Sequence, residues 1–159
     1  MKLVGKYQDI HPTAKIADSA RICGWCFIGK DVVIGENTVI GNFSEINSGA
    51  KIGNNTLINS HCHINSDTVI GNDCIFGASV LTADEKYMTS HTERIKKTPC
   101  VIGDNVKVGQ HASLVCCKIG NNVSIGTATV VMNDIPNNEV WIGIPAKKLR
   151  DVSEAELKL

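Results

Sequence analysis

Aromatic side chains are scarce in this chain of 159 residues, which has only two Trp, two Tyr and three Phe. A core for one domain of this length must therefore be built mainly from aliphatic and small side chains. Net charge is lacking as well, because sixteen Lys and Arg balance sixteen Asp and Glu. This balance argues against a nucleic-acid-binding protein driven by a basic field.

Long apolar runs and an export signal are also missing. No run of about eighteen apolar residues occurs, so we expect no membrane-spanning helix. Residues 1–12 lack the apolar segment of a secretory signal, so we expect a cytoplasmic protein. Seven cysteines in a chain without such a signal favour free thiols over a disulfide framework, and we expect no bound metal.

The chain repeats itself with a period of six residues. The position directly after each repeated aliphatic residue is often Gly or Asn, and the fourth position after it is small or β-branched. The pattern resumes at Ile102, drops one residue at 116–118, and continues to Val131. Before the gap, the repeated positions are Ile10, Ile16, Ile22, Ile28, Ile34, Ile40, Ile46, Ile52, Ile58, Ile64, Ile70 and Phe76.

A period of six fits neither an α-helix nor one long strand, but it fits a short strand followed by a turn. Three such units make a triangular coil of eighteen residues, and stacking puts each residue above the one eighteen positions later. One predicted column contains Ile16, Ile34, Ile52 and Ile70. Each coil buries its inner face only by stacking on its neighbours, as in other repeat proteins.

This pattern resembles the left-handed β-helix of the hexapeptide-repeat acyltransferases over about residues 10–150, and the segment Gly143–Lys147 resembles their closing motif. The resemblance implies an all-β fold, a left-handed parallel β-helix of about seven triangular coils in residues 1–150. Its handedness comes from the resemblance alone. Residues 151–159 are expected to form a short helix or a tail.

The sixfold pattern disappears in the polar segment 82–100. A polar insertion of this length in a regular solenoid is typical of a functional loop or a disordered one. In the acyltransferases that the chain resembles, a loop at this place reaches over the groove between subunits and helps to form the acceptor site of a trimer. The resemblance therefore implies a homotrimer.

The resemblance also implies an acetyl-CoA-dependent acyltransferase that acts on a sugar or nucleotide-linked sugar. Such a reaction needs proximity and, for some acceptors, a general base. Cys62 occupies an inward position, so His61 and His63 point outward in the coil before the loop. We expect His61 to be the base, with His63, Asp84 and His91 as lesser candidates. Both N- and O-acetylation stay open, because Glu85 stands where galactoside O-acetyltransferases have a His.

The coenzyme is expected along the C-terminal coils. By resemblance, backbone groups near Gly109, Gln110, Thr127 and Ala128 would bond the pantetheine amides. Cations near the C-terminal end suit a ligand with phosphates, and the candidates are Lys147, Lys148 and Arg150.

Two other functions are alternatives for a chain with this repeat. A γ-class carbonic anhydrase shares this helix but needs three His on one metal. His61 and His63 are two residues apart across a core position, which does not match that spacing. A non-catalytic solenoid that binds partners is the other alternative, and the long polar loop and the closing motif argue against it.

Overall fold

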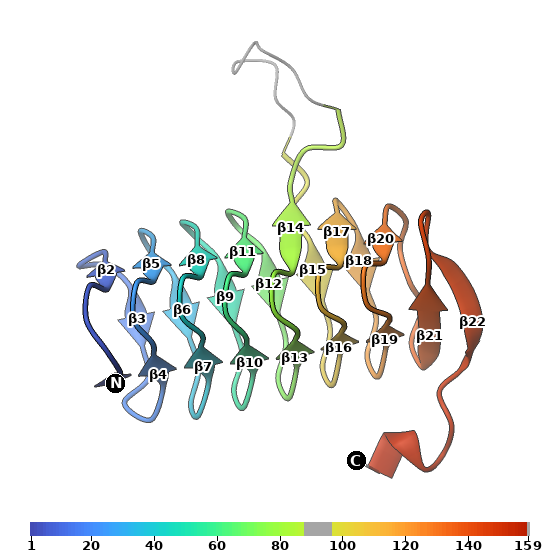
Figure 1. The fold of residues 1–159 in the computed structure, drawn as a ribbon, viewed down its shortest axis with the longest axis horizontal. Coiled ribbons are helices and arrows are strands. Elements are labelled where there is room, and N and C mark those ends of the chain that lie inside the picture. The colour runs from blue at the N-terminus through green and yellow to red at the C-terminus, as the bar shows by residue number, and fades with distance from the viewer. Residues whose placement is uncertain (88–96, 159) are drawn as a thin grey trace.

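The computed structural model describes residues 1–87 and 97–158, which form a parallel β-helix with three faces (Figure 1). In Figure 1 the chain rises on the near side and descends on the far side while it advances from left to right. A coil with this sense is left-handed. The predicted all-β fold is therefore confirmed.

Each face is a sheet of strands stacked along the axis. Face A contains β1 (Lys2–Leu3), β4 (Arg21–Ile22), β7 (Val39–Ile40), β10 (Leu57–Ile58), β13 (Ile75–Phe76), β16 (Lys107–Val108), β19 (Ser124–Ile125), β21 (Glu139–Ile142) and β22 (Lys147–Asp151). Face B contains β2 (Asp9–Ile10), β5 (Phe27–Ile28), β8 (Glu45–Ile46), β11 (His63–Ile64), β14 (Leu81–Ala83), β17 (Ser113–Val115) and β20 (Val130–Val131). Face C contains β3 (Lys15–Ile16), β6 (Val33–Ile34), β9 (Lys51–Ile52), β12 (Val69–Ile70), β15 (Val101–Ile102) and β18 (Lys118–Ile119).

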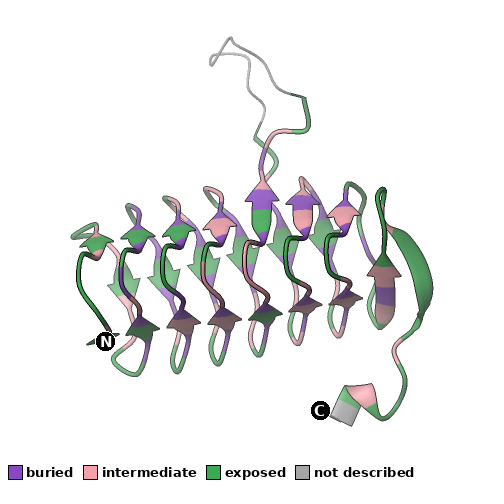
Figure 2. Ribbon diagram, viewed as in Figure 1, coloured by how far each residue is buried: buried purple, intermediate pink, exposed green. Residues whose placement is uncertain are grey.

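Most strands have two residues, the first pointing outward and the second into the core, as strand geometry requires (Figure 2). The predicted column is present, because Ile34 pairs with Ile16 on one side and Ile52 on the other, and Ile52 pairs with Ile70. Cys26 and Cys62 are buried in the core, as small residues at the fourth position. The core is thus the aliphatic filling that the scarcity of aromatics predicts.

The corners between faces hold residues with positive φ. At the corner from face C to face A these residues are Asn37, Asn55, Asp73, Asn105, Asn122 and Asn138. Asn and Asp tolerate the left-handed conformation better than most residues. Their side chains also bond along the axis, as where Asn37 donates to Asn55 over 3.2 Å and Asn122 to Asn138 over 2.8 Å.

The coils of the β-helix include both ends of the polar segment 82–100, beyond the limits that the sixfold pattern indicates. Thr82 takes the inward position of β14, and Cys100 is fully buried just before β15. The segment that leaves the coil therefore spans 84–99 rather than 82–100. Past the dropped residue, Lys118 pairs with Val101, so the register recovers at once.

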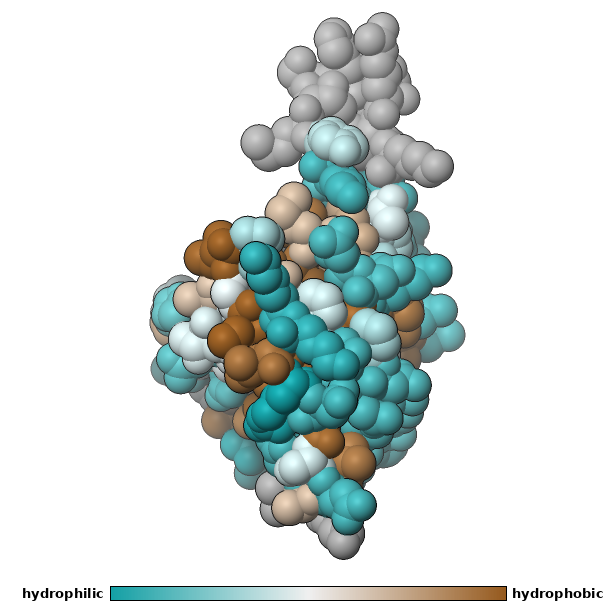
Figure 3. Space-filling view, turned by 90° about the vertical axis from the view of Figure 1, so that its right-hand side faces the viewer, coloured by the Kyte–Doolittle hydropathy of each residue, from teal (hydrophilic) through white to brown (hydrophobic). Residues whose placement is uncertain are grey.

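The C-terminal end is closed by an antiparallel pair, which the sequence does not predict. Here β22 folds back on β21 so that Glu139 lies opposite Asp151. Hydrophilic side chains cross this end beside exposed apolar ones (Figure 3). The expected helix is a single 3₁₀ turn, Glu156–Lys158. No helix within residues 1–87 and 97–158 is long and apolar enough to cross a membrane.

Replacing Ile52 by Ala tests the column. Ile52 is 2% exposed between Ile34 and Ile70, so the variant should lose roughly 2–5 kcal/mol of unfolding free energy. The matched control is Lys51→Ala, one residue away on the outward side, with an expected change within about 0.5 kcal/mol. Equal losses for both variants in urea denaturation would show that the register is wrong.

The cysteines give a second test. All seven are free thiols: Cys23 and Cys116 are half-buried, and the other five are buried. Burial raises the pKa of the Cys62 thiol, and that of Cys74 to about 11, which further lowers their reactivity. A disulfide reagent should modify two thiols in the folded protein and seven after unfolding without reductant. More than three in the folded state, or fewer than seven in total, would contradict this arrangement.

Candidate functional site

A polar cluster lies on face B at the base of the projecting segment. It is built by strands β8, β11 and β14, in which the outward residues Glu45, His63 and Leu81 are paired neighbours. The site is therefore a consequence of the eighteen-residue register, which places His63 directly beside Glu45.

The ring of His63 is held on both sides. Its Nδ1 lies 3.0 Å from Oε2 of Glu45. Its Nε2 lies 3.2 Å from Nδ2 of Asn47 and 3.3 Å from Oδ1 of Asn65. With the proton on Nδ1 donated to Glu45, Nε2 accepts from Nδ2 of Asn47 and can accept a proton, which suits a general base; the protonated ring would then donate to Oδ1 of Asn65. The His63 side chain remains 45% exposed, so solutes can reach it.

Asp84 connects this cluster to both ends of the projecting segment. It is only 6% exposed, and its Oδ1 accepts a hydrogen bond of 2.8 Å from Nδ2 of Asn65. Its Oδ2 lies 3.4 Å from Nζ of Lys97, and its carbonyl accepts a bond of 2.7 Å from the N–H of Thr98. Asp84 therefore ties residues 97 and 98, on the return side, to the coil.

His61 points outward, as expected, but at the corner between faces A and B. Its ring is stacked on that of Phe43, with centroids 5.0 Å apart and planes 10° apart. His111 occupies the same corner two coils later, with a φ of 59° against 61° for His61. His91 lies outside the described residues. Of the four predicted catalytic candidates, the structure brings His63 and Asp84 into one cluster through Asn65.

The four residues expected to meet the pantetheine lie together at the A-to-B corner of two neighbouring coils. The N–H of Ala128 donates to the carbonyl of Gln110 over 2.8 Å, and the N–H of Gly109 donates to the carbonyl of Ile125. Gly109 is needed for close approach, since a Cβ there would lie 2.4 Å from the nitrogen of Thr127. Within the described residues, the N–H groups of Gln110 and Thr127 have no partner, and both residues are exposed. These two N–H groups fit a ligand amide carbonyl.

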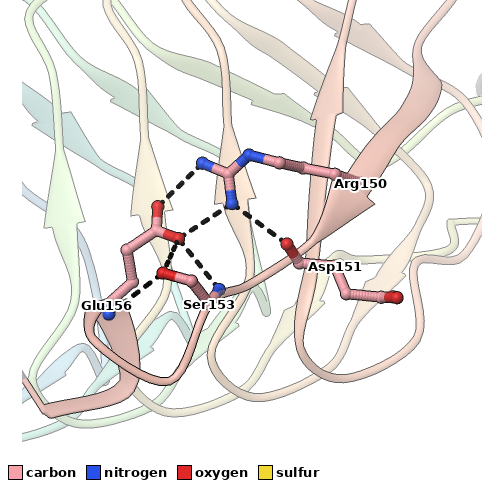
Figure 4. A network of polar contacts seen from close by, with 4 residues as sticks. All are labelled: Arg150, Asp151, Ser153 and Glu156. Carbon is pink, nitrogen blue, oxygen red and sulfur yellow. Dashed lines mark hydrogen bonds and ion pairs between the residues drawn. The ribbon is translucent and has the colours of Figure 1, made fainter.

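The predicted phosphate ligands lie on β22 and are mostly paired already. Lys148 Nζ lies 2.8 Å from Glu139 and 2.7 Å from Asp151, and hydrogen bonding to these carboxylates raises the pKa of Lys148. Arg150 makes two bonds to Glu156, of 2.8 and 2.9 Å, which lower the pKa of that carboxyl (Figure 4). Ser153 bonds the same carboxylate. Lys147 is exposed, and no ion pair is found for it in the described part of the chain.

Sequence reasoning missed Glu45, Asn47 and Asn65 as parts of the site. The eighteen-residue step carries the signal, because Glu45 is eighteen positions before His63 and Asn47 eighteen before Asn65. Outward residues on neighbouring coils of one face are therefore candidates for the same site.

A family model for the bacterial transferase hexapeptide (six repeats) matches residues 13–48 and 49–83. Within these residues the chain therefore matches the hexapeptide repeats of this model. The repeats expected from the sixfold pattern are thereby confirmed. No curated protein matches the chain.

Several solved structures share the hexapeptide-repeat fold. A variant of AntD, an N-acyltransferase from Bacillus cereus in complex with dTDP and coenzyme A, is 15% identical, with a TM-score of 0.69 over 98% of this chain and 86% of that one. A Bacillus cereus protein assigned to the acetyltransferases is 24% identical, with a TM-score of 0.68 over 96% and 83%. A hexapeptide-repeat acetyltransferase from Vibrio cholerae in complex with acetyl coenzyme A is 21% identical, with a TM-score of 0.60 over 80% and 71%. At these identities the likeness shows the fold.

A metal site is not apparent in the part of the chain that the structure covers. Residues 1–87 and 97–158 contain no group of three His, Cys, Asp or Glu side chains that could hold an ion. The carbonic anhydrase alternative therefore has no support from these residues.

Proposed function

We propose that the protein is an acetyl-CoA-dependent acyltransferase that transfers an acetyl group to an amine or hydroxyl of a sugar or nucleotide-linked sugar. The observation that carries the proposal is the pair of His63 and Glu45, 3.0 Å apart, in the coil before the projecting segment. The hexapeptide repeats support it, and so do the acyltransferases with the same fold. The proposal includes a cytoplasmic location, where free thiols persist.

In the proposed reaction acetyl-CoA supplies an acetyl thioester. Glu45 holds the proton on Nδ1 of His63, so Nε2 can take a proton from the acceptor hydroxyl or ammonium group. The acceptor oxygen or nitrogen then bonds the acetyl carbon as the carbon–sulfur bond breaks, and the released thiolate is protonated. The free N–H groups of Gln110 and Thr127 would bind the pantetheine, with Lys147 at the phosphates.

The geometry favours His63 over His61 as the base. His63 has a carboxylate partner that fixes its ring and stabilises the imidazolium, whereas the His61 ring is stacked on Phe43. Asp84 serves in this proposal as a positioning residue, since its carboxylate is engaged by Asn65 and Lys97. His91 remains a proposed acceptor contact.

Replacing His63 by Ala should lower kcat by about 10²–10⁴, the usual worth of a positioned base. The dissociation constant of acetyl-CoA should stay near that of the wild type, because the coenzyme is proposed to lie along later coils. Glu45→Gln should lower kcat less, because an amide does not stabilise the imidazolium. His61→Ala is the matched control at an outward His of the same coil. A normal kcat in His63→Ala together with a large loss of kcat in His61→Ala, both at saturating acceptor and acetyl-CoA, would assign the base to His61.

We also propose a homotrimer. Residues 84–87 leave the coil after β14 on face B (Figure 1), and an acceptor site that uses this segment would be completed by a neighbouring subunit. Light scattering should give three times the chain mass of 17.1 kDa at micromolar concentration. A mass of 17.1 kDa under these conditions would contradict the trimer.

A further inference from the structure

Four rings form an exposed stack along the corner between faces A and B. They belong to Tyr7, Trp25, Phe43 and His61, at intervals of eighteen residues. Successive centroids lie 4.3, 6.2 and 5.0 Å apart, with interplanar angles of 30°, 13° and 10°. This aromatic ladder contains three of the seven Trp, Tyr and Phe residues of the protein, together with His61, and none of it lies in the core.

The backbone does not require aromatic residues at these places. Each ladder residue has a φ between 60° and 65°, a conformation better suited to Gly or Asn. At the corner from face C to face A, where the backbone also has positive φ, five of the six residues with positive φ are Asn. Residues held in a costly conformation are grounds for suspecting a function.

The ladder has a gap one coil high. The next residue in the column is Ser79, with a φ of 61°, and the one after is His111, with a φ of 59°. Backbone bonds keep all three in register, since Ser79 N–H donates to the Ser60 carbonyl over 3.0 Å and His111 N–H to the Ala78 carbonyl over 2.9 Å. The half-buried Ser79 therefore stands where a ring would continue the stack.

The size of the gap fits one flat ring. Neighbouring coils are about 4.8 Å apart, so the coils of His61 and His111 are about 9.6 Å apart. A ring above Ser79 would lie about 4.8 Å along the axis from the coil of His61 and from the coil of His111. This distance is similar to the 5.0 Å between the ring centroids of Phe43 and His61. Stacked rings prefer separations of this order.

We propose that the corner at Ser79 binds the base of a nucleotide, stacked between His61 and His111. The inference rests on the proposed function, because it assigns the nucleotide-bearing substrate of the same reaction. Leu81, two residues beyond Ser79, pairs with His63, so a base at this corner lies close to the proposed general base. Two substrates could supply the ring, the nucleotide of a nucleotide-linked sugar or the adenine of coenzyme A.

The test fills the gap with a ring that belongs to the protein. In Ser79→Phe the new ring should continue the ladder, because Phe43 has the same backbone conformation at the equivalent corner. Ser79→Ala is the matched control, which leaves the gap open. Binding of UDP, dTDP, GDP and adenosine 3′,5′-bisphosphate is measured by calorimetry on all three proteins.

Wild type and Ser79→Ala should bind at least one nucleotide with equal affinity, and Ser79→Phe should bind it about fivefold to a hundredfold more weakly, the usual worth of one stacked base. A loss for a nucleoside diphosphate assigns the gap to the acceptor, and a loss for the adenosine bisphosphate alone assigns it to the coenzyme. Equal binding by Ser79→Phe, or no binding of any of the four by the wild type, would overturn the proposal.

A second readout separates this inference from the proposed function. A base between the two imidazoles should shift the ring proton resonances of His61 and His111 upfield, and leave those of His11 unchanged. These spectra need no turnover. Acetyl transfer that persists without such shifts would reject the gap as a binding site and keep the acyltransferase. Shifts of both resonances in a protein that shows no acetyl transfer would keep the binding site and reject the acyltransferase.

Discussion

The stacking of each coil on the next, eighteen residues along the chain, is the constraint on which the structure depends. Inward Ile residues form continuous columns, and backbone bonds join every coil to its neighbours. Coils come so close that a Cβ on Gly41 would lie 2.5 Å from the nitrogen of Ser60. Because this spacing is fixed, a side chain meets its neighbours from other coils mainly at steps of eighteen residues. Core, corners and functional site are all built by that one rule.

The same rule explains how far the sequence predicts the molecule. Columns such as Ile34–Ile52–Ile70 follow from counting, because inward positions must be filled. The contact between His63 and Glu45 was open to the same counting, but nothing in the period marks an outward residue as functional. The ion pair of Asp84 with Lys97 was beyond it, since the path of an inserted segment is set by its own side chains and not by the repeat.

The C-terminal closure lies outside the repeat for a related reason. Stacked parallel strands leave an open edge at the last coil, which invites pairing with another chain. Here β22 covers β21 in an antiparallel pair, with Lys148 bridging Glu139 and Asp151. A run of charged residues gives no strand signal by propensity, so this pairing depends on tertiary context. It also means that Lys148 and Arg150 would have to share or exchange carboxylate partners to meet a phosphate.

The two kinds of corner show where the fold carries a cost that folding alone does not explain. A left-handed conformation costs a non-Gly residue about 1–2 kcal/mol, less for Asn. The Asn side chains also bond from coil to coil, as Asn37 does to Asn55. Aromatic pairs return about 0.5–1.5 kcal/mol each by stacking, so the three pairs of the ladder do not fully offset the strain at its four residues. Its last ring, on His61, belongs to the coil that carries His63. The aromatic corner of the β-helix therefore leads to the polar cluster on face B, an arrangement that the stability of the fold does not require.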